Sequence, residues 1–144
     1  MIERQFMEAA LQQARAANAA GEVPVGAVLV KDGRILSVGR NRREETKSAL
    51  AHAEIEAIHA ACQAVGDWRL TGCTLYVTLE PCRMCFGAIC SARIDRVVFG
   101  AYDPAAGCVS TGDAVPQDLQ FIGGYMETEC RELLQTTFQT LRNK

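Results

Sequence analysis

The sequence predicts an α/β protein in which helices cover both faces of a central mixed sheet of about five strands. Segments with helical spacing of apolar residues alternate along the chain with short runs of strand-forming residues, which is typical of layered α/β folds. An Asp-Gly turn joins two of these runs as an antiparallel hairpin. The length of 144 residues, without a repeat or a linker, predicts a single domain over residues 1–144.

The first half of the chain is predicted to fold as helix, hairpin and helix, over residues 6–20, 23–30, 34–39 and 51–65. In both helices apolar residues recur every three to four positions, and a glycine follows each, Gly21 or Gly66. The two strands flank Asp32-Gly33, a strong two-residue hairpin turn. A polar stretch, residues 41–48, leads to the second helix, which is expected to begin near His52.

The second half is predicted to contain three strands and two helices, over residues 74–78, 82–92, 96–100, 120–123 and 127–141. The first strand is rich in β-formers and reads as buried, and Pro81 after it suits the first turn of a helix. Residues 103–116 have loop composition. Strands that alternate with helices imply a sheet covered on both faces.

Charge and hydropathy exclude several classes of protein. The formal net charge of -2 argues against a protein that coats nucleic acid through bulk positive charge. No stretch approaches the ~18 to 20 consecutive apolar residues of a membrane helix. Charged residues at the N-terminus stand where a signal peptide has its apolar core, so the expected location is the cytoplasm.

One segment is nonetheless locally basic. Its cations are Arg34, Arg40, Arg42, Arg43 and Lys47, with Glu44 and Glu45 as the only acids between them. Such a cluster can hold a few phosphates, or it can be an ordinary solvated surface.

The seven cysteines are an odd number, and a reducing compartment disfavours disulfides. Cys82 and Cys85 form a Cys-x-x-Cys at the start of a predicted helix, where free backbone N–H groups stabilise thiolates. This spacing serves catalytic metal sites, structural zinc knuckles and dithiol redox centres alike. The remaining cysteines are expected to be small buried apolar groups: Cys62, Cys73, Cys90, Cys108 and Cys130.

A third ligand narrows these alternatives. The chain has two histidines, and seven residues of helix would separate their imidazoles by ~10 Å, so they cannot share one ion. His52 opens its helix and is the expected ligand, whereas His59 is expected to be a surface or packing residue. One imidazole and two thiolates leave the fourth position of a tetrahedral zinc free for water, which is typical of a catalytic site. We therefore expect one Zn²⁺ per chain, bound by His52, Cys82 and Cys85.

Glu54 follows the histidine ligand by two residues. It can lie near the ion without binding it, take a proton from water whose pKa the zinc has lowered, and pass this proton to a leaving group. Its other interpretation is a first-turn acid favoured by the helix dipole. In combination with the cysteine pair, it is the predicted catalytic residue.

These residues resemble the zinc-dependent cytidine deaminase-like superfamily, in which His-x-Glu and Pro-Cys-x-x-Cys form the active site. Residues 22–30, 51–55 and 74–82 are similar to bacterial tRNA-specific adenosine deaminases, and the similarity covers nearly the whole chain. The resemblance implies a three-layer α/β/α fold, a homodimer, and conversion of adenosine to inosine at the wobble position of a tRNA anticodon loop. It also implies that Asn41 contacts the flipped base and Asp103 a neighbouring ribose. From the residues alone, both positions suit turns.

Several positions depart from the family pattern. Ala49 and Leu50 replace a proline and a threonine, Phe86 replaces a small residue, residues 111–119 are shortened, and Thr137 stands where paired aromatics are common. Phe86 can narrow the pocket or fill core space. These departures leave open an alternative, a deaminase of a free nucleobase or nucleoside such as guanine or cytosine deaminase. A non-catalytic zinc or RNA-binding module and a dithiol redox protein are further alternatives.

Overall fold

The computed structural model describes residues 1–142, with side chains through Gln135. Its helices and strands follow one another in the order α1 (Arg4–Ala19), β1 (Gly26–Lys31), β2 (Arg34–Arg40), α2 (Arg43–Thr46), α3 (Ala53–Val65), β3 (Thr74–Leu79), α4 (Arg83–Ser91), β4 (Arg96–Ala101), β5 (Gln120–Ile122) and α5 (Glu127–Arg142). No helix within residues 1–142 is both long enough and apolar enough to cross a membrane.

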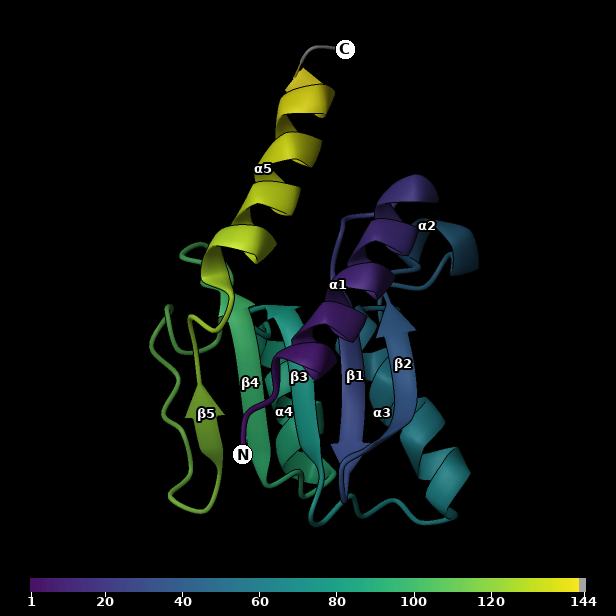
Figure 1. The fold of residues 1–144 in the computed structure, drawn as a ribbon, viewed down its shortest axis with the longest axis vertical. Helices are drawn as coiled ribbons and strands as arrows, with labels where there is room; N and C mark the ends of the chain where they lie inside the picture. The colour runs from purple at the N-terminus through teal and green to yellow at the C-terminus, as the bar shows by residue number, and fades with distance from the viewer. Residues whose placement is uncertain (143–144) are drawn as a thin grey trace.

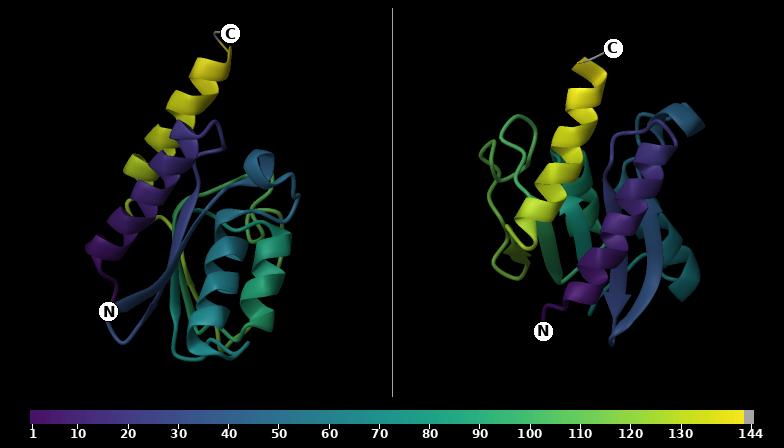
Figure 2. Two further views of the ribbon diagram at one scale, coloured as in Figure 1. Left: turned by 90° about the vertical axis from the view of Figure 1, so that its right-hand side faces the viewer. Right: turned by 45° about the horizontal axis from the view of Figure 1, so that its top comes forward.

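The five strands form one mixed sheet in the order β2-β1-β3-β4-β5. β1 is antiparallel to both of its neighbours, and β3, β4 and β5 run parallel to one another. α1 and α5 cover one face of the sheet, and α3 and α4 cover the other (Figures 1 and 2). The predicted three-layer α/β/α fold with a mixed five-stranded sheet is therefore confirmed.

Burial along the strands follows from these layers. In β1 and β3 nearly every residue is buried, because helices cover both faces of the central strands. β2 is an edge strand and exposes much of its length, including Val38. Apolar side chains of all three layers pack into one core cluster.

Two glycines bring helices close to the sheet. A Cβ at Gly26 would overlap the backbone of α1 at Ala10, and a Cβ at Gly39 would overlap the backbone of α3 at Ala53. The sheet-facing sides of both helices therefore carry alanines, such as Ala14 and Ala57. In α3 this close contact fixes the first turn of the helix, which is the turn that bears the predicted catalytic residue.

Apart from shifts of one or two residues at the ends of elements, the structure differs from the prediction in two places. β1 begins at Gly26 rather than at residue 23, because Pro24 has no N–H for a sheet ladder and the Val25 N–H bonds locally to the Val23 carbonyl. The polar stretch 41–48 contains the short helix α2, which its composition did not indicate.

The cysteines and the second histidine lie largely as expected. All seven cysteines are free. Of the five outside the motif, Cys73, Cys108 and Cys130 are buried, whereas Cys62 and Cys90 are only half-buried, so the expectation of burial is correct for three. His59 is exposed on α3, as expected of a surface histidine.

Candidate functional site

Two helix starts bring the predicted metal ligands together at the carboxyl end of β3. His52 is the N-cap of α3, Cys82 is the N-cap of α4, and Cys85 lies in the first turn of α4. The Nδ1 atom of His52 is 3.6 Å from the Cys82 Sγ and 3.5 Å from the Cys85 Sγ. Within residues 1–142, no other cluster of three or more His, Cys, Asp or Glu side chains has its ligand atoms this close together.

This geometry fits zinc. Tetrahedral Zn–S and Zn–N bonds place a sulfur and a nitrogen ligand about 3.6 Å apart, close to the two distances found here. The His52 side chain makes no capping hydrogen bond to the helix, so its ring is available to a metal. Cys85 is fully buried, whereas His52 and Cys82 are half-buried, so the set opens towards one side only.

The three ligand side chains differ in how readily they lose a proton. Hydrogen bonds from the Cys85 thiol and the His52 ring lower the pKa of Cys82 to about 3. The same contact with Cys82, together with burial, raises the pKa of Cys85. The hydrogen bond to Cys82 also raises the pKa of His52. A divalent cation takes the place of such protons, because metal ligands bind in their deprotonated forms.

Glu54 lies one residue inside α3 and is 4% exposed. Burial raises the pKa of its carboxyl to about 7, because a low-dielectric environment disfavours the charged form. A carboxyl with a pKa near 7 can both accept and release a proton at neutral pH. Its position beside the three ligands, but outside their set, is the one predicted for a proton carrier.

A pocket of about 190 Å³ opens next to the ligands. It brings together five of the six predicted site residues, namely Asn41, His52, Glu54, Cys82 and Asp103; only Cys85 does not line it. Pockets for drug-sized ligands run ~300 to 1,000 Å³. A volume below that range suits one flat base better than a whole nucleotide.

Asn41 and Asp103, the two predicted substrate contacts, also stabilise turns, which was their alternative interpretation from the sequence. Asn41 is buried, and its Oδ1 accepts a hydrogen bond from the Arg43 N–H at 3.2 Å. The Oδ1 of Asp103 accepts the N–H groups of Ala105 and Ala106, both at 3.2 Å. Each side chain therefore shapes its own loop and also lines the pocket.

Besides Arg43 of the predicted basic cluster, the pocket is lined by residues that sequence reasoning missed, which are Val23, Val25, Ala53, Leu79, Glu80 and Ala106. Glu80 is the most informative of them, because it is a charged residue that is only 2% exposed. A carboxylate between a buried strand and Pro81-Cys82 was a signal that could have identified it. The apolar residues gave no such signal, because they have the composition of ordinary core residues.

The predicted basic cluster is divided by its ion pairs. Glu45 pairs with Arg40 at 3.0 Å and accepts a hydrogen bond from Arg42 at 2.6 Å. Arg43 is exposed, lines the pocket, and forms no ion pair with any residue that the structure describes. Of the cations in this segment, Arg43 is thus the best placed to meet a phosphate beside the pocket.

The departures from the family pattern lie mostly outside the pocket. Phe86 is buried and packs edge-on against Phe121, with ring centroids 5.6 Å apart, so it fills the core and does not narrow the site. Leu50 is 59% exposed and does not line the pocket. In the shortened segment, Asp113 pairs with Arg83 at 3.2 Å. The side chain of Thr137 lies outside the described residues.

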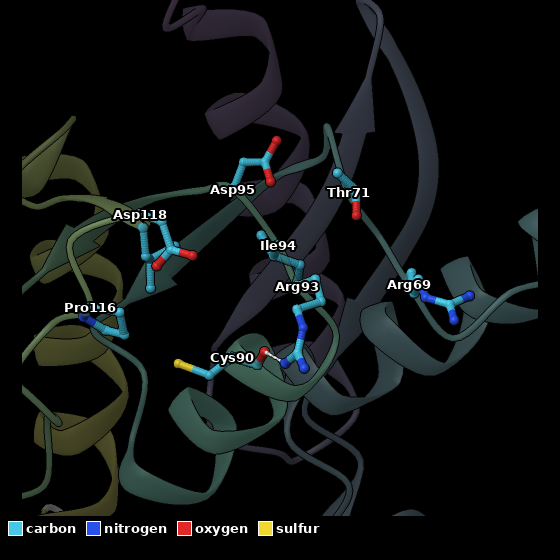
Figure 3. A pocket seen from close by; sticks show the side chains of 9 residues that line it. Arg69, Thr71, Cys90, Arg93, Ile94, Asp95, Pro116 and Asp118 are labelled. Atoms are coloured by element: carbon cyan, nitrogen blue, oxygen red, sulfur yellow. Dashed lines mark hydrogen bonds between the residues drawn. The ribbon is translucent and has the colours of Figure 1, made fainter.

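A larger cavity, about 550 Å³, lies away from the metal ligands, where α4 ends and β4 begins (Figure 3). Three of the four charged residues that line it have partners. Arg69 pairs with Asp67 at 3.3 Å, Arg93 donates to the carbonyl of Cys90, and Asp95 accepts the Gly72 N–H. The metal-binding cluster found among the described residues, His52 with Cys82 and Cys85, lies at the smaller pocket instead.

Comparison with known proteins agrees with this geometry. Residues 1–101 match the cytidine and deoxycytidylate deaminase zinc-binding region. A tRNA-specific adenosine deaminase of Bacillus subtilis is 46% identical over 96% of this chain and 90% of its own. A solved structure from a study of A-to-I editing by tRNA:A34 deaminases at the wobble position is 45% identical. It has a TM-score of 0.85 over 92% of this chain and 100% of its own.

A guanine deaminase from Bacillus subtilis is also similar, at 34% identity and a TM-score of 0.69, over 100% of this chain and 96% of its own. The chain belongs to the cytidine and deoxycytidylate deaminase zinc-binding family, a family of zinc-dependent deaminases. Within it, the relatives that this chain matches at 46% identity are tRNA-specific adenosine deaminases.

Proposed function

We propose that this protein catalyses the zinc-dependent hydrolytic deamination of adenosine to inosine at the wobble position of a tRNA anticodon. One observation carries the proposal. The pocket holds a buried carboxyl, Glu54, beside a histidine and two cysteines that can bind zinc and leave one coordination position open. The similarity to tRNA-specific adenosine deaminases over nearly the full length supports the substrate.

The proposed ligands of the zinc are His52, Cys82 and Cys85. When bound, zinc supplies Lewis-acid chemistry that lowers the pKa of water towards neutrality. Glu54 takes a proton from the attacking water as the oxygen adds to the C6 atom of adenine. It then delivers this proton to the amino nitrogen, the C6–N bond breaks and ammonia leaves, and the proton of the added hydroxyl moves to N1 as C6 becomes the carbonyl of inosine.

The substrate is proposed to enter with only its base inside the pocket, whose volume of about 190 Å³ leaves the ribose and the flanking nucleotides outside. The amide of Asn41 binds an edge of the base, since its Oδ1 is engaged by Arg43 and its NH₂ group remains to donate. Asp103 binds a neighbouring ribose, and Arg43 a phosphate of the loop.

Deamination of a free nucleobase or nucleoside would use the same site. One departure that could have favoured it does not: Phe86 packs in the core against Phe121. The sequence identity to the guanine deaminase structure, 34%, is also lower than the 45% identity to the tRNA:A34 deaminase structure. Both observations support the tRNA substrate.

We further propose a cytoplasmic homodimer. The resemblance to tRNA-specific adenosine deaminases supports the dimer, and the proposed tRNA substrate supports the location. Light scattering coupled to gel filtration should give twice the mass of the chain. A monomer at micromolar concentration would contradict the dimer.

The deciding experiment for the substrate measures inosine in short anticodon stem-loops that carry adenosine at the wobble position. The zinc-loaded enzyme is run in parallel against a panel of free purines and pyrimidines, with Glu54→Ala as the inactive control. We expect inosine at the wobble position and no turnover of the free bases. Efficient turnover of a free base, with no inosine in any stem-loop, would replace the proposal with the nucleobase alternative.

A further inference from the structure

Glu80 lies between β3 and the zinc-ligand helix, and no step of the proposed reaction uses it. Its side chain is almost completely buried yet borders the pocket. Burying a charge costs free energy unless hydrogen bonds satisfy it, so such a residue must have compensating partners.

The partners of Glu80 all come from one loop. Its Oε1 accepts the Asp103 N–H at 3.1 Å and the Ser110 hydroxyl at 2.5 Å. Its Oε2 accepts the N–H groups of Val109 and Ser110 at 2.9 Å and 2.8 Å. A single carboxylate thus holds both the beginning and the end of residues 103–110.

The loop also packs directly on the carboxylate and on the metal-ligand segment. A Cβ at Gly107 would overlap the carboxyl group of Glu80, so no side chain fits between them. Gly107 forms an isolated antiparallel bridge with Cys82, and the Cys108 N–H donates to the Pro81 carbonyl at 2.8 Å. The loop is therefore held at a fixed distance from a zinc ligand.

The loop forms part of the wall of the pocket, through Asp103 and Ala106. We propose that Glu80 is a positioning residue, which fixes residues 103–110 against Cys82 and thereby sets where the pocket wall meets the nucleoside. It acts on substrate binding and not on the proton transfer. The part of this inference that concerns substrate rests on the proposed function.

The test compares Glu80→Gln with Gly107→Ala in the zinc-loaded enzyme. Glutamine keeps the shape of the side chain but places an NH₂ group opposite backbone N–H donors. Alanine at position 107 leaves the Glu80 carboxylate intact but displaces the loop from it by steric overlap. Ser110→Ala removes one of the four hydrogen bonds and is the mildest variant. Glu8→Gln, on the exposed face of α1, is the matched control for the loss of a charge.

The first readout is amide hydrogen exchange, which needs no substrate. Exchange at Val109 and Ser110 should accelerate about tenfold or more in Glu80→Gln, the scale of losing hydrogen bonds to a charged group. Exchange in β3 and the zinc content should stay as in the wild type and in Glu8→Gln. Unchanged exchange at both amides would overturn the proposal. If Glu80→Gln does not fold, Gly107→Ala decides it by the same criterion.

The second readout is steady-state kinetics on an anticodon stem-loop. KM should rise about tenfold in Glu80→Gln and Gly107→Ala, because the variants lose binding energy that ground state and transition state share. kcat should remain nearly unchanged, because Glu54 and the zinc ligands stay in place. A fall in kcat at constant KM would overturn the positioning role. If the wild type itself leaves stem-loops unmodified, the proposed function fails, whereas the exchange experiment still decides whether Glu80 holds the loop.

Discussion

The two walls of the pocket are built in different ways. One wall is carried by helix starts: His52 and Glu54 open α3, and Cys82 opens α4. The other wall is carried by loops, with Asn41 before α2 and Asp103 after β4. The helix wall holds the groups with chemistry to perform, and the loop wall holds the groups proposed to recognise the substrate.

The walls also differ in what holds them. Backbone hydrogen bonds of α3 and α4 fix the helix wall, and Gly39 lets α3 lie directly on the sheet. Two buried carboxylates fix the loop wall: Glu80 binds residues 103–110, and Glu22 accepts the N–H groups of Glu44 and Glu45. The groups proposed for chemistry therefore stand on helices packed on the sheet, whereas the groups proposed for recognition stand on loops that long-range polar contacts hold.

Loss of a zinc ligand should have the largest effect and tests the helix wall as a whole. Cys82→Ala or Cys85→Ala should lose zinc and all measurable activity, because the site keeps only two of its three protein ligands. Metal analysis of the purified variants measures this directly. Cys90→Ala, in the same helix but away from the site, is the control and should keep one zinc per chain. Full zinc occupancy in both ligand variants would refute the assignment.

Glu54→Ala should have the next largest effect. We expect kcat to fall by ~10²- to 10⁴-fold, the typical contribution of a positioned proton carrier. Zinc content and thermal stability should stay close to wild type, because every ligand remains. Glu56→Ala, two residues further along α3, is the matched control and should keep its activity. Turnover near that of the wild type in Glu54→Ala would remove Glu54 from the mechanism.

Much of the fold could be predicted from sequence, because its signals are local. The Asp32-Gly33 hairpin, the helices that end near glycine and the buried strand 74–79 all follow from neighbouring residues. The start of β1 and the helix α2 were not predicted. The apolar run from Val23 concealed the effect of Pro24 on the start of β1, and α2 is only four residues long, too short to show a helical pattern of apolar residues.

The same distinction applies to the site. Spacing of two and three residues at helix starts was enough to group His52 with Glu54 and Cys82 with Cys85. The role of Glu80 was not predictable, because its partners lie 23 to 30 residues away in a loop of ordinary composition. Nor could the sequence tell which arginines Glu45 neutralises.

Asn41 tests recognition by the loop wall, with a moderate expected effect. Asn41→Asp keeps an Oδ1 acceptor for the Arg43 N–H but replaces the amide donor with a charged acceptor, so it tests the contact with the base while the turn is retained. We expect kcat/KM for the stem-loop to fall about tenfold or more, the scale of one lost buried hydrogen bond. Ser48→Ala, whose Oγ accepts only the Leu50 N–H, is the control in the same connection. If Asn41→Asp affects the stem-loop no more than Ser48→Ala does, the base contact must lie elsewhere.

Loss of Arg43 should have the smallest effect. Arg43 lies in the same segment as Arg40 and Arg42, which Glu45 already pairs, so the three arginines can be compared directly. A phosphate contact releases counterions, so log affinity falls with log salt by ~0.7 per neutralised single-strand phosphate. Arg43→Ala should therefore reduce the slope for stem-loop binding by about that amount. Arg42→Ala should reduce it less, because the guanidinium of Arg42 is already paired with Glu45 and is less available to a phosphate. Binding titrations between low and physiological salt measure both slopes, with kcat at saturating substrate expected to be unchanged. Equal slopes in the wild type and Arg43→Ala would show that the pocket meets its substrate without this cation, which is the behaviour expected for a free base.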